Sequence, residues 1–375
     1  MLRKLKILLL IILLLIILVF GLLKTSLKKK HKYLKELLVS GSLGSYSSLA
    51  EDTIIKDDIL FVMGTNTISH GSDSASTSRP ISPYTVLNQG NGILFVETTE
   101  KRNPSSLVLC AIESAARVYP DRPVAFFIKG LNDITTEEEE NRTRISFPTL
   151  SSYKNIYFFP LRMEELFMYT PLITWYKRVL PRWERFWTHV SSDACRFAMM
   201  WKYGGIYMDT DVISLHPVPT NNFIAAESFK FTSSSVFGLS PFHSLTWEFM
   251  QNFVENYRGN YWGYQGPRLF TRVMRRLCGN LKFKSVDDNV TCGNVSYLHP
   301  ERFYPIVSSS WKIYFKVWQN LPTFNKSYGL HFWNYRNNEQ ETMVPGSNTL
   351  VEHLYQQHCP STYGSILKKK VPSGV

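Results

Sequence analysis

The sequence predicts an α/β fold in which helices pack around a mostly parallel central sheet. Three runs rich in β-branched and aromatic residues, at 93–98, 123–131 and 155–161, are typical of buried strands. A helical pattern over 106–119 separates the first two runs, and strands that alternate with helices indicate βαβ units. Ligands of such sheets bind beyond the carboxyl ends of the strands. Polar residues that follow a strand directly are therefore candidates for a site.

The first segment of the sequence is a candidate membrane anchor. Residues 7–23 form an apolar run of 17 residues without a charge, which spans roughly 25 Å at about 1.5 Å per residue. Lys24 follows without a small-x-small cleavage site, so we predict an uncleaved signal anchor over 7–23 after a cytosolic tail over 1–6, with a cleaved signal peptide as the alternative. Basic residues are more numerous after this run than before it, which disagrees with the positive-inside rule for a lumenal body.

Four N-glycosylation signals nevertheless favour a lumenal main body. Residues 24–91, basic at first and then rich in Ser, Gly and Thr, are predicted to be a flexible stem, and 92–375 a single folded domain. The glycosylation signals begin at Asn141, Asn289, Asn294 and Asn325.

Five cysteines suit an oxidising compartment. Cys278 and Cys292 flank a polar loop and are the first candidates for a disulfide. Cys110 and Cys359 could form a second bridge. Cys195 lies within a predicted helix, where we expect a small buried thiol.

The formal net charge of +12 comes from the two ends of the chain. Residues 1–35 hold nine Lys or Arg and no acid, and 368–370 are three lysines, which leaves 30 basic and 30 acidic residues elsewhere. A balanced main body lacks the basic surface that nucleic-acid binding requires, so we expect no nucleic-acid partner. The acidic run 137–140 is predicted to be a solvated loop.

A helix is predicted immediately before a pair of aspartates. One of the serines at 191–192 can cap its start, and Gly204 and Gly205 can end it. Asp193 and Arg196 are three residues apart and share one face of this helix.

The run 206–212 is predicted to be a strand, which would project Asp209 and Asp211 to the same side of the sheet. Two carboxylates on one side repel each other. A hard divalent cation such as Mn²⁺ or Mg²⁺ relieves this repulsion and can also hold the two phosphates of a nucleoside diphosphate. An Asp-x-Asp sequence that arose by chance at a strand end is the alternative.

The segment 192–212 resembles the donor-binding region of the α-1,4-glycosyltransferases with a DXD motif, family 32 of the glycosyltransferases. The similarity covers roughly residues 92–365 and continues in the motifs CAIESAARVYP, YWGYQGPRLFTRV, GLHFWN and NTLVEHLYQQHCP. It implies a GT-A type nucleotide-sugar-binding fold, a UDP-sugar donor and Mn²⁺, with Mg²⁺ as the other candidate ion. It also implies a single-pass type II protein of the Golgi membrane whose catalytic domain, 92–375, is lumenal.

The resemblance implies roles for individual residues. Asp209 and Asp211 become ligands of the metal and the diphosphate, and His331 matches the position that completes the metal shell, with a core histidine as the alternative. Asp193 and Arg196 look like contacts to the donor sugar and the diphosphate, with an ion pair on the helix surface as the alternative. The donor-binding candidates are Glu97, Thr98, Asp193, Arg196, Gly204, Gly205, Asp209, Asp211 and Gly266.

Gln265 and Asp211 are the catalytic candidates. By analogy with related retaining enzymes, Gln265 lies near the anomeric carbon on the β face, with a hydrogen-bonding loop residue as the alternative. Trp262 and Tyr264 could stack on the acceptor sugar or belong to the core. Retention needs either a covalent intermediate or attack from the face of the leaving group. Because no carboxylate nucleophile stands out in the sequence, front-face attack is the preferred mechanism.

The activity that the resemblance implies is retaining transfer of GlcNAc from UDP-GlcNAc, in α-1,4 linkage, to a terminal β-galactose of mucin-type O-glycans. The expected partners are the UDP-sugar donor and a β-galactose-terminated glycan on a glycoprotein or glycolipid. One alternative is an α-1,4-galactosyltransferase that uses UDP-galactose and glycolipid acceptors. Another is an inactive, membrane-tethered sugar-binding protein. Recognition of the acetamido group depends on contacts worth only about 1–3 kcal/mol, so the donor preference is based on similarity alone.

Overall fold

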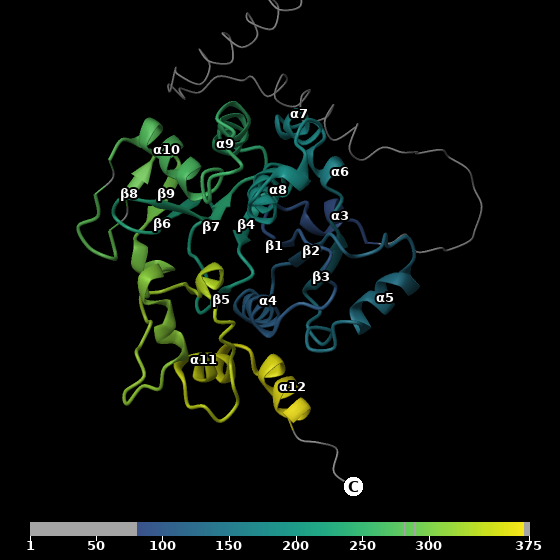
Figure 1. The fold of residues 1–375 in the computed structure, drawn as a ribbon, viewed down its shortest axis with the longest axis vertical. Coiled ribbons are helices and arrows are strands. Elements are labelled where there is room, and N and C mark those ends of the chain that lie inside the picture. Colours follow the sequence, from purple (N-terminus) through teal and green to yellow (C-terminus); the bar gives the residue numbers. More distant parts are fainter. Residues whose placement is uncertain (1–80, 281, 289, 371–375) are drawn as a thin grey trace, which may run out of the picture. The chain divides into compact units, whose positions relative to one another are not determined.

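The computed structural model describes residues 81–370 except Leu281 and Asn289 (Figure 1). The predicted cytosolic tail, the anchor over 7–23, most of the stem and the glycosylation signal at Asn289 lie outside the described residues. Among the helices that the structure does describe, none combines the length and the apolar composition that a membrane span requires.

The central sheet has eight strands in the order β3-β2-β1-β4-β7-β6-β9-β8. All strands run in one direction except β7 and β8, which are antiparallel to their neighbours. The sheet is therefore mixed, and the predicted parallel arrangement is confirmed for its β3-β2-β1-β4 half. The strands are β1 (Ile93–Glu97), β2 (Val124–Ile128), β3 (Ile156–Pro160), β4 (Gly205–Met208), β6 (Phe223–Ala226), β7 (Thr232–Leu239), β8 (Val290–Cys292) and β9 (Val295–Leu298).

Helices cover both faces of this sheet (Figure 1). They are α3 (Pro83–Leu87), α4 (Ser106–Val118), α5 (Glu137–Ile145), α6 (Met163–Phe167), α7 (Leu172–Tyr176), α8 (Trp187–Tyr203), α9 (Ser244–Glu255), α10 (Pro267–Cys278), α11 (Leu350–His358) and α12 (Pro360–Lys370). The acidic run predicted to be a loop is instead the first turn of α5. Thr136 and Glu139 form a reciprocal capping box there, which supplies partners for backbone N–H groups at the helix start.

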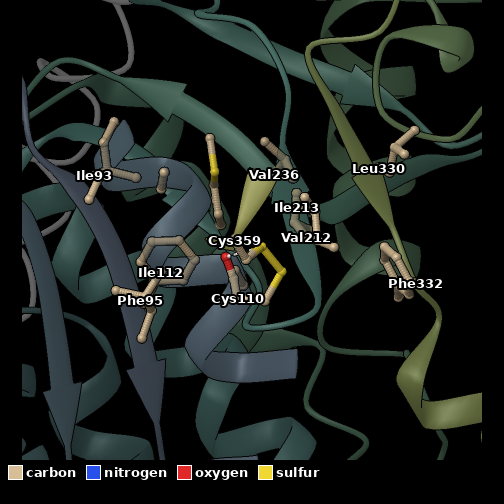
Figure 2. Packing of buried hydrophobic residues seen from close by; sticks show 14 of the residues in the cluster. Ile93, Phe95, Cys110, Ile112, Val212, Ile213, Val236, Leu330, Phe332 and Cys359 are labelled. Atoms are coloured by element: carbon tan, nitrogen blue, oxygen red, sulfur yellow. Dashed lines mark hydrogen bonds between the residues drawn. A yellow bond between two sulfur atoms is a disulfide. The ribbon is translucent and has the colours of Figure 1, made fainter. Parts of the chain in front are cut away.

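Successive residues of β1 show how the two faces are buried. Ile93 and Phe95 belong to the hydrophobic cluster shared with α4 and α11, whereas Leu94 and Val96 belong to the cluster shared with α8, α9 and α10. Figure 2 shows the first cluster, in which Phe95 lies close to Ile112 of α4. A strand that is buried on both faces has a continuous apolar sequence, which explains why the sequence located β1, β2 and β3 to within two or three residues.

The strand predicted over 206–212 is divided into two. β4 ends at Met208, and β5 (Val212–Ser214) belongs to a separate two-stranded sheet with β10 (Gly329–His331). Residues 209–211 form the turn between them, so the side chains of this acid pair are placed by a turn and not by the alternation of a strand. The antiparallel register sets His331 opposite Val212, which brings a residue about 120 positions later in the chain beside Asp211.

Helix α8 begins at Trp187, earlier than predicted, and neither serine at 191–192 caps it. Its N-cap, Phe186, makes no side-chain cap bond. Packing extends the helix instead, since the Trp187 ring stacks on Trp175 of α7 with 5.9 Å between centroids. Gly204 ends the helix as predicted, at φ +61°, and a Cβ there would come within 2.4 Å of Pro241.

Two disulfides are present, Cys278–Cys292 and Cys110–Cys359, and the second joins positions 249 residues apart. Figure 2 shows this bond between α4 and the end of α11. Cys195 is buried and, in the part of the chain that the structure describes, unpaired. Among the glycosylation candidates, Asn141, Asn294 and Asn325 are exposed, so their modification stays a prediction that the fold permits.

The last residue of α11 is expected to make stability depend on pH. Burial, and secondly the nearby charge of Arg117, lower the pKa of His358 from its ordinary 6.5 to about 4. Between these values the unfolded chain binds a proton at this position and the folded chain does not, so the free energy of unfolding falls as the pH drops from 6.5 to 4. Replacing His358 with Asn should flatten this part of a plot of melting temperature against pH. An unchanged slope in the variant would contradict the assignment to His358.

Candidate active site

A polar cavity of about 360 Å³ lies at the edge of the sheet where β1, β4 and β6 end and β7 begins. An acid lies at the end of each of these three strands: Glu97 is the last residue of β1, Asp209 follows β4, and Glu227 follows β6. Serines 233–235 at the start of β7 add hydroxyl groups. The site therefore occupies the position expected for an α/β sheet. The predicted site residues that line it are Glu97, Thr98, Asp193, Arg196, Asp209, Asp211, Trp262 and His331.

Two carboxylates and one imidazole converge in this cavity. One ligand atom each from Asp209, Asp211 and His331 lie within 4.8 Å of one another. His331 Nε2 is 3.4 Å from Asp211 Oδ1, and Asp211 Oδ2 accepts a 2.8 Å hydrogen bond from the backbone N–H of Asn334. The His331 side chain is only 4% exposed. The structure therefore assembles the predicted metal ligands into one cluster.

The chemistry of this donor set suits a divalent cation. Carboxylate oxygens are preferred by Mg²⁺ and Mn²⁺, and an imidazole adds a nitrogen ligand of the kind that transition metals accept. The backbone N–H of Trp333 lies 3.3 Å from His331 Nδ1, whereas Nε2 is the ring nitrogen that faces Asp211. His331 would therefore offer Nε2 to a bound ion beside the two carboxylates.

Arg196 is the central cation of the site. Its guanidinium lies 3.1 Å from Asp209 Oδ1 and 3.4 Å from Asp193 Oδ1, donates to Ser234 O at 2.7 Å and to Ser192 Oγ at 3.0 Å, and stacks on the Tyr207 ring. Arg196 is 5% exposed and Asp193 is 6% exposed. The two side chains do form the ion pair that was the alternative reading, but the pair is buried in the cavity wall and not exposed on the helix surface.

Asp193 is a buried acid whose pKa is shifted by its surroundings. Burial raises the pKa of Asp193 to about 7, and Arg196 opposes this shift. Gly266 packs directly on its carboxylate, since a Cβ at this glycine would come within 2.4 Å of Asp193 Oδ1. Gly266, itself a donor-binding candidate, thus allows the backbone to pack closely against Asp193. Gly204 and Gly205 do not line the cavity; a Cβ on Gly205 would come within 2.1 Å of Gly92 O, so this glycine allows two strands to approach.

The structure does not bring Gln265 into the cavity. Its side chain is buried, its Nε2 donates to Phe253 O at 2.8 Å, and its Oε1 accepts from the N–H of Arg258 at 3.0 Å. This is the alternative role, that of a residue which fixes the loop before α10. Tyr264 also lies away from the cavity lining. The guanidinium groups of Arg258 and Arg272 make cation–π contacts with its ring.

Trp262 lines the cavity and stacks on Tyr335, with 4.5 Å between ring centroids. Tyr335 was not a sequence candidate, and neither was Glu227. The sequence did carry a signal for Glu227, because the residue directly follows the short apolar run 223–226. Burial raises the pKa of Glu227, whereas His331 and then Arg336 lower it.

Comparison with protein families gives two consecutive matches. Residues 105–230 match the glycosyltransferase sugar-binding region containing a DXD motif, and residues 238–366 match the alpha 1,4-glycosyltransferase conserved region. The first match contains Asp209 and Asp211, and the second contains His331. The fold and the acid–histidine cluster are those of a glycosyltransferase with a DXD motif.

Named relatives agree with both matches. Human alpha-1,4-N-acetylglucosaminyltransferase is 49% identical over 283 residues, which cover 76% of this chain and 83% of that protein. Mouse lactosylceramide 4-alpha-galactosyltransferase is 35% identical over 275 residues, which cover 72% and 75%. The chain belongs to the α-1,4-glycosyltransferase family. Among solved structures, a galactosyltransferase in complex with donor and acceptor sugar analogues is similar over 75% of this chain and 98% of that one, at 13% identity and a TM-score of 0.38.

Proposed function

We propose that the chain transfers GlcNAc from UDP-GlcNAc, in α-1,4 linkage and with retention, to a terminal β-galactose of an O-glycan. The observation that supports this most is the 49% identity to a relative named for that transfer, against 35% to a relative named for galactose transfer. The cluster of Asp209, Asp211 and His331 supports an active enzyme over an inactive sugar-binding protein, because all three ligand groups are in place.

In this proposal Asp209, Asp211 and His331 would hold Mn²⁺ in a GT-A type fold, with Glu97 and Thr98 on the uridine side of the cavity. When bound there, a divalent ion would supply Lewis-acid stabilisation of the negative charge that develops on the β-phosphate of departing UDP. Asn334 fixes the orientation of the Asp211 carboxylate through its backbone N–H. The site is thus partly preorganised before the donor binds.

Arg196 has a positioning role in this proposal. Its N–H groups are occupied by Asp209, Ser192 and Ser234, so it acts on the diphosphate through Asp209. The guanidinium fixes the position of the Asp209 carboxylate, together with the hydroxyl of Tyr207, which donates to Asp209 Oδ1 at 2.8 Å. We further propose a lumenal catalytic domain on a type II anchor of the Golgi membrane, which the two disulfides and the exposed sequons support.

Product analysis with two donors tests this function. The purified full chain is incubated with Mn²⁺ and either UDP-GlcNAc or UDP-galactose, each with a core-2 O-glycan and with lactosylceramide. We expect α-1,4-linked GlcNAc on the terminal galactose of the O-glycan as the main product. A preference for UDP-galactose and lactosylceramide would instead support the activity for which the mouse lactosylceramide 4-alpha-galactosyltransferase is named. Glycan binding without release of UDP from either donor would show a sugar-binding protein.

A further inference from the structure

Five carboxylates line the cavity, and four of them already have partners. Glu97 accepts a 2.8 Å hydrogen bond from the N–H of Thr99, and Asp193, Asp209 and Asp211 are held by the contacts described above. Across residues 81–370, apart from 281 and 289, nothing hydrogen-bonds or ion-pairs with the carboxylate of Glu227. Glu227 is half-buried, and the charges of His331 and Arg336 offset only part of its desolvation, since its pKa stays raised.

The backbone around Glu227 is held firmly, so its free carboxylate is not the result of a loose loop. Its N–H donates to Phe231 O at 2.8 Å across the turn between β6 and β7. The same turn is fixed to α10, because Arg275 donates to Lys230 O at 2.6 Å and Thr232 N–H donates to Thr271 Oγ1 at 3.0 Å. A preorganised, unpartnered acceptor that faces a cavity is suited to receive a hydrogen bond from a ligand.

The sheet order places Glu227 at the end of the cavity opposite the nucleotide side. Glu97 is the last residue of β1, and Glu227 follows β6. The two strands are three positions apart in the sheet, which corresponds to roughly 14 Å at about 4.8 Å per strand. Asp209 and Asp211 follow β4, between the two. In the proposed function, a diphosphate held at β4 with its nucleoside toward β1 would direct the sugar and its anomeric carbon toward β7 and β6.

Against the raising effect of burial, His331 and Arg336, both in the segment 331–336, lower the pKa of Glu227. The same segment carries Tyr335, whose ring stacks on Trp262. These two aromatic rings form a flat surface of the kind on which sugars stack. Glu227 lines the same cavity as these two rings.

We propose that the Glu227 carboxylate contacts the acceptor: it accepts a hydrogen bond from a hydroxyl of the acceptor sugar and holds the attacking hydroxyl at the anomeric carbon. This inference rests on the proposed function. In the transfer step the bond from the anomeric carbon to the β-phosphate oxygen breaks, and the acceptor oxygen forms the new bond to that carbon. The proton of the attacking hydroxyl moves to the departing phosphate oxygen, so Glu227 keeps its charge throughout.

Comparison of transfer with hydrolysis tests this role. The full chain and the variants Glu227→Ala and Glu227→Gln are assayed with Mn²⁺ and UDP-GlcNAc, once with p-nitrophenyl β-galactoside and once with water as the only acceptor. We expect Glu227→Ala to lower kcat/KM for the galactoside about 10- to 100-fold, the size of one hydrogen bond to a charged group. We expect the ratio of transfer to hydrolysis to fall with it. Glu227→Gln keeps an acceptor oxygen and should lose less.

A control variant and melting temperatures distinguish a loss of acceptor binding from a loss of folding or of donor binding. Glu255→Gln, an exposed acid at the end of α9, is the control, and melting temperatures of all variants report folding. Equal losses of transfer and hydrolysis would overturn the proposal in favour of a donor contact, and a covalent sugar adduct on Glu227 would overturn it in favour of a nucleophile. If the wild-type protein is active and Glu227→Ala changes kcat/KM for the galactoside by less than twofold, this inference is refuted and the proposed function is not. A wild-type protein that releases no UDP with any acceptor would refute the proposed function as well.

Discussion

Replacing Asp211 with Asn is expected to lower the rate of sugar transfer by about 10²–10³-fold, the scale on which enzymes lose a group that stabilises transition-state charge. Asn retains an oxygen that can accept the 2.8 Å hydrogen bond from Asn334, so the turn at 209–211 should keep its shape. What the variant loses is a negative charge in the acid–histidine cluster, and with it the affinity for a divalent ion. Initial rates with saturating donor and acceptor measure the effect.

Asp121→Asn is the matched control, because Asp121 is exposed and lies outside the cavity. It should retain the wild-type rate. Asp211→Asn and Asp209→Asn should both be impaired, and the Asp209 variant should also be less stable, since Asp209 compensates the buried charge of Arg196. Wild-type transfer by Asp211→Asn would show that this carboxylate has no part in the reaction.

Replacing Arg196 with Met is expected to lower the free energy of unfolding by about 3–5 kcal/mol, the range measured when one partner of a buried ion pair is removed. The side chain is similar in length, so lost packing is a small part of the effect. The main cost is that Asp193 and Asp209 remain close together without the cation that both contact. Urea unfolding of the purified full chain, compared with Arg142→Met on the exposed helix α5, provides the measurement.

Two further variants separate charge from geometry at this position. Arg196→Lys keeps the charge but loses the planar fork that reaches Asp209, Ser192 and Ser234 together, so it should recover only part of the stability. Asp193, whose pKa is about 7 even beside Arg196, takes up a proton in Arg196→Met. Adding Asp209→Asn to Arg196→Met removes the carboxylate that Arg196 contacts most closely and should restore part of the loss. A stability within about 1 kcal/mol of wild type for Arg196→Met would mean that this cation does not hold the site together.

The parts of the fold that the sequence predicted well are those in which local pattern and tertiary position agree. β1, β2 and β3 are buried on both faces, and a continuous apolar run is the direct consequence. The start of α8 was misplaced because the ring of Trp187 stacks on Trp175, a contact between distant segments that no local capping signal encodes. The acidic run 137–140 was misread because its charges outweighed the capping box of Thr136 and Glu139.

In the candidate site, too, the residues that a local sequence pattern marks were predicted from it, and those placed by tertiary contacts were not. Asp209 and Asp211 could be identified from their spacing, although a turn and not a strand brings them together. His331 reaches them only through the pairing of β10 with β5, which local sequence does not reveal, so its role came from the family resemblance. Gln265 had the right residue type for a polar site, but both ends of its amide bind backbone groups. Glu227 was missed because its one signal, a position directly after a four-residue apolar run, is weak without a second acid or a motif beside it.

The central claim is that Asp209, Asp211 and His331 together hold a divalent ion to which the donor diphosphate binds. Calorimetric titration of the purified full chain with UDP, first with Mn²⁺ and then with excess EDTA, tests it most directly. The account predicts saturable UDP binding with Mn²⁺ and a loss of that binding in EDTA and in Asp211→Asn. Equal UDP affinity with and without the metal, in both the wild-type protein and Asp211→Asn, would contradict it.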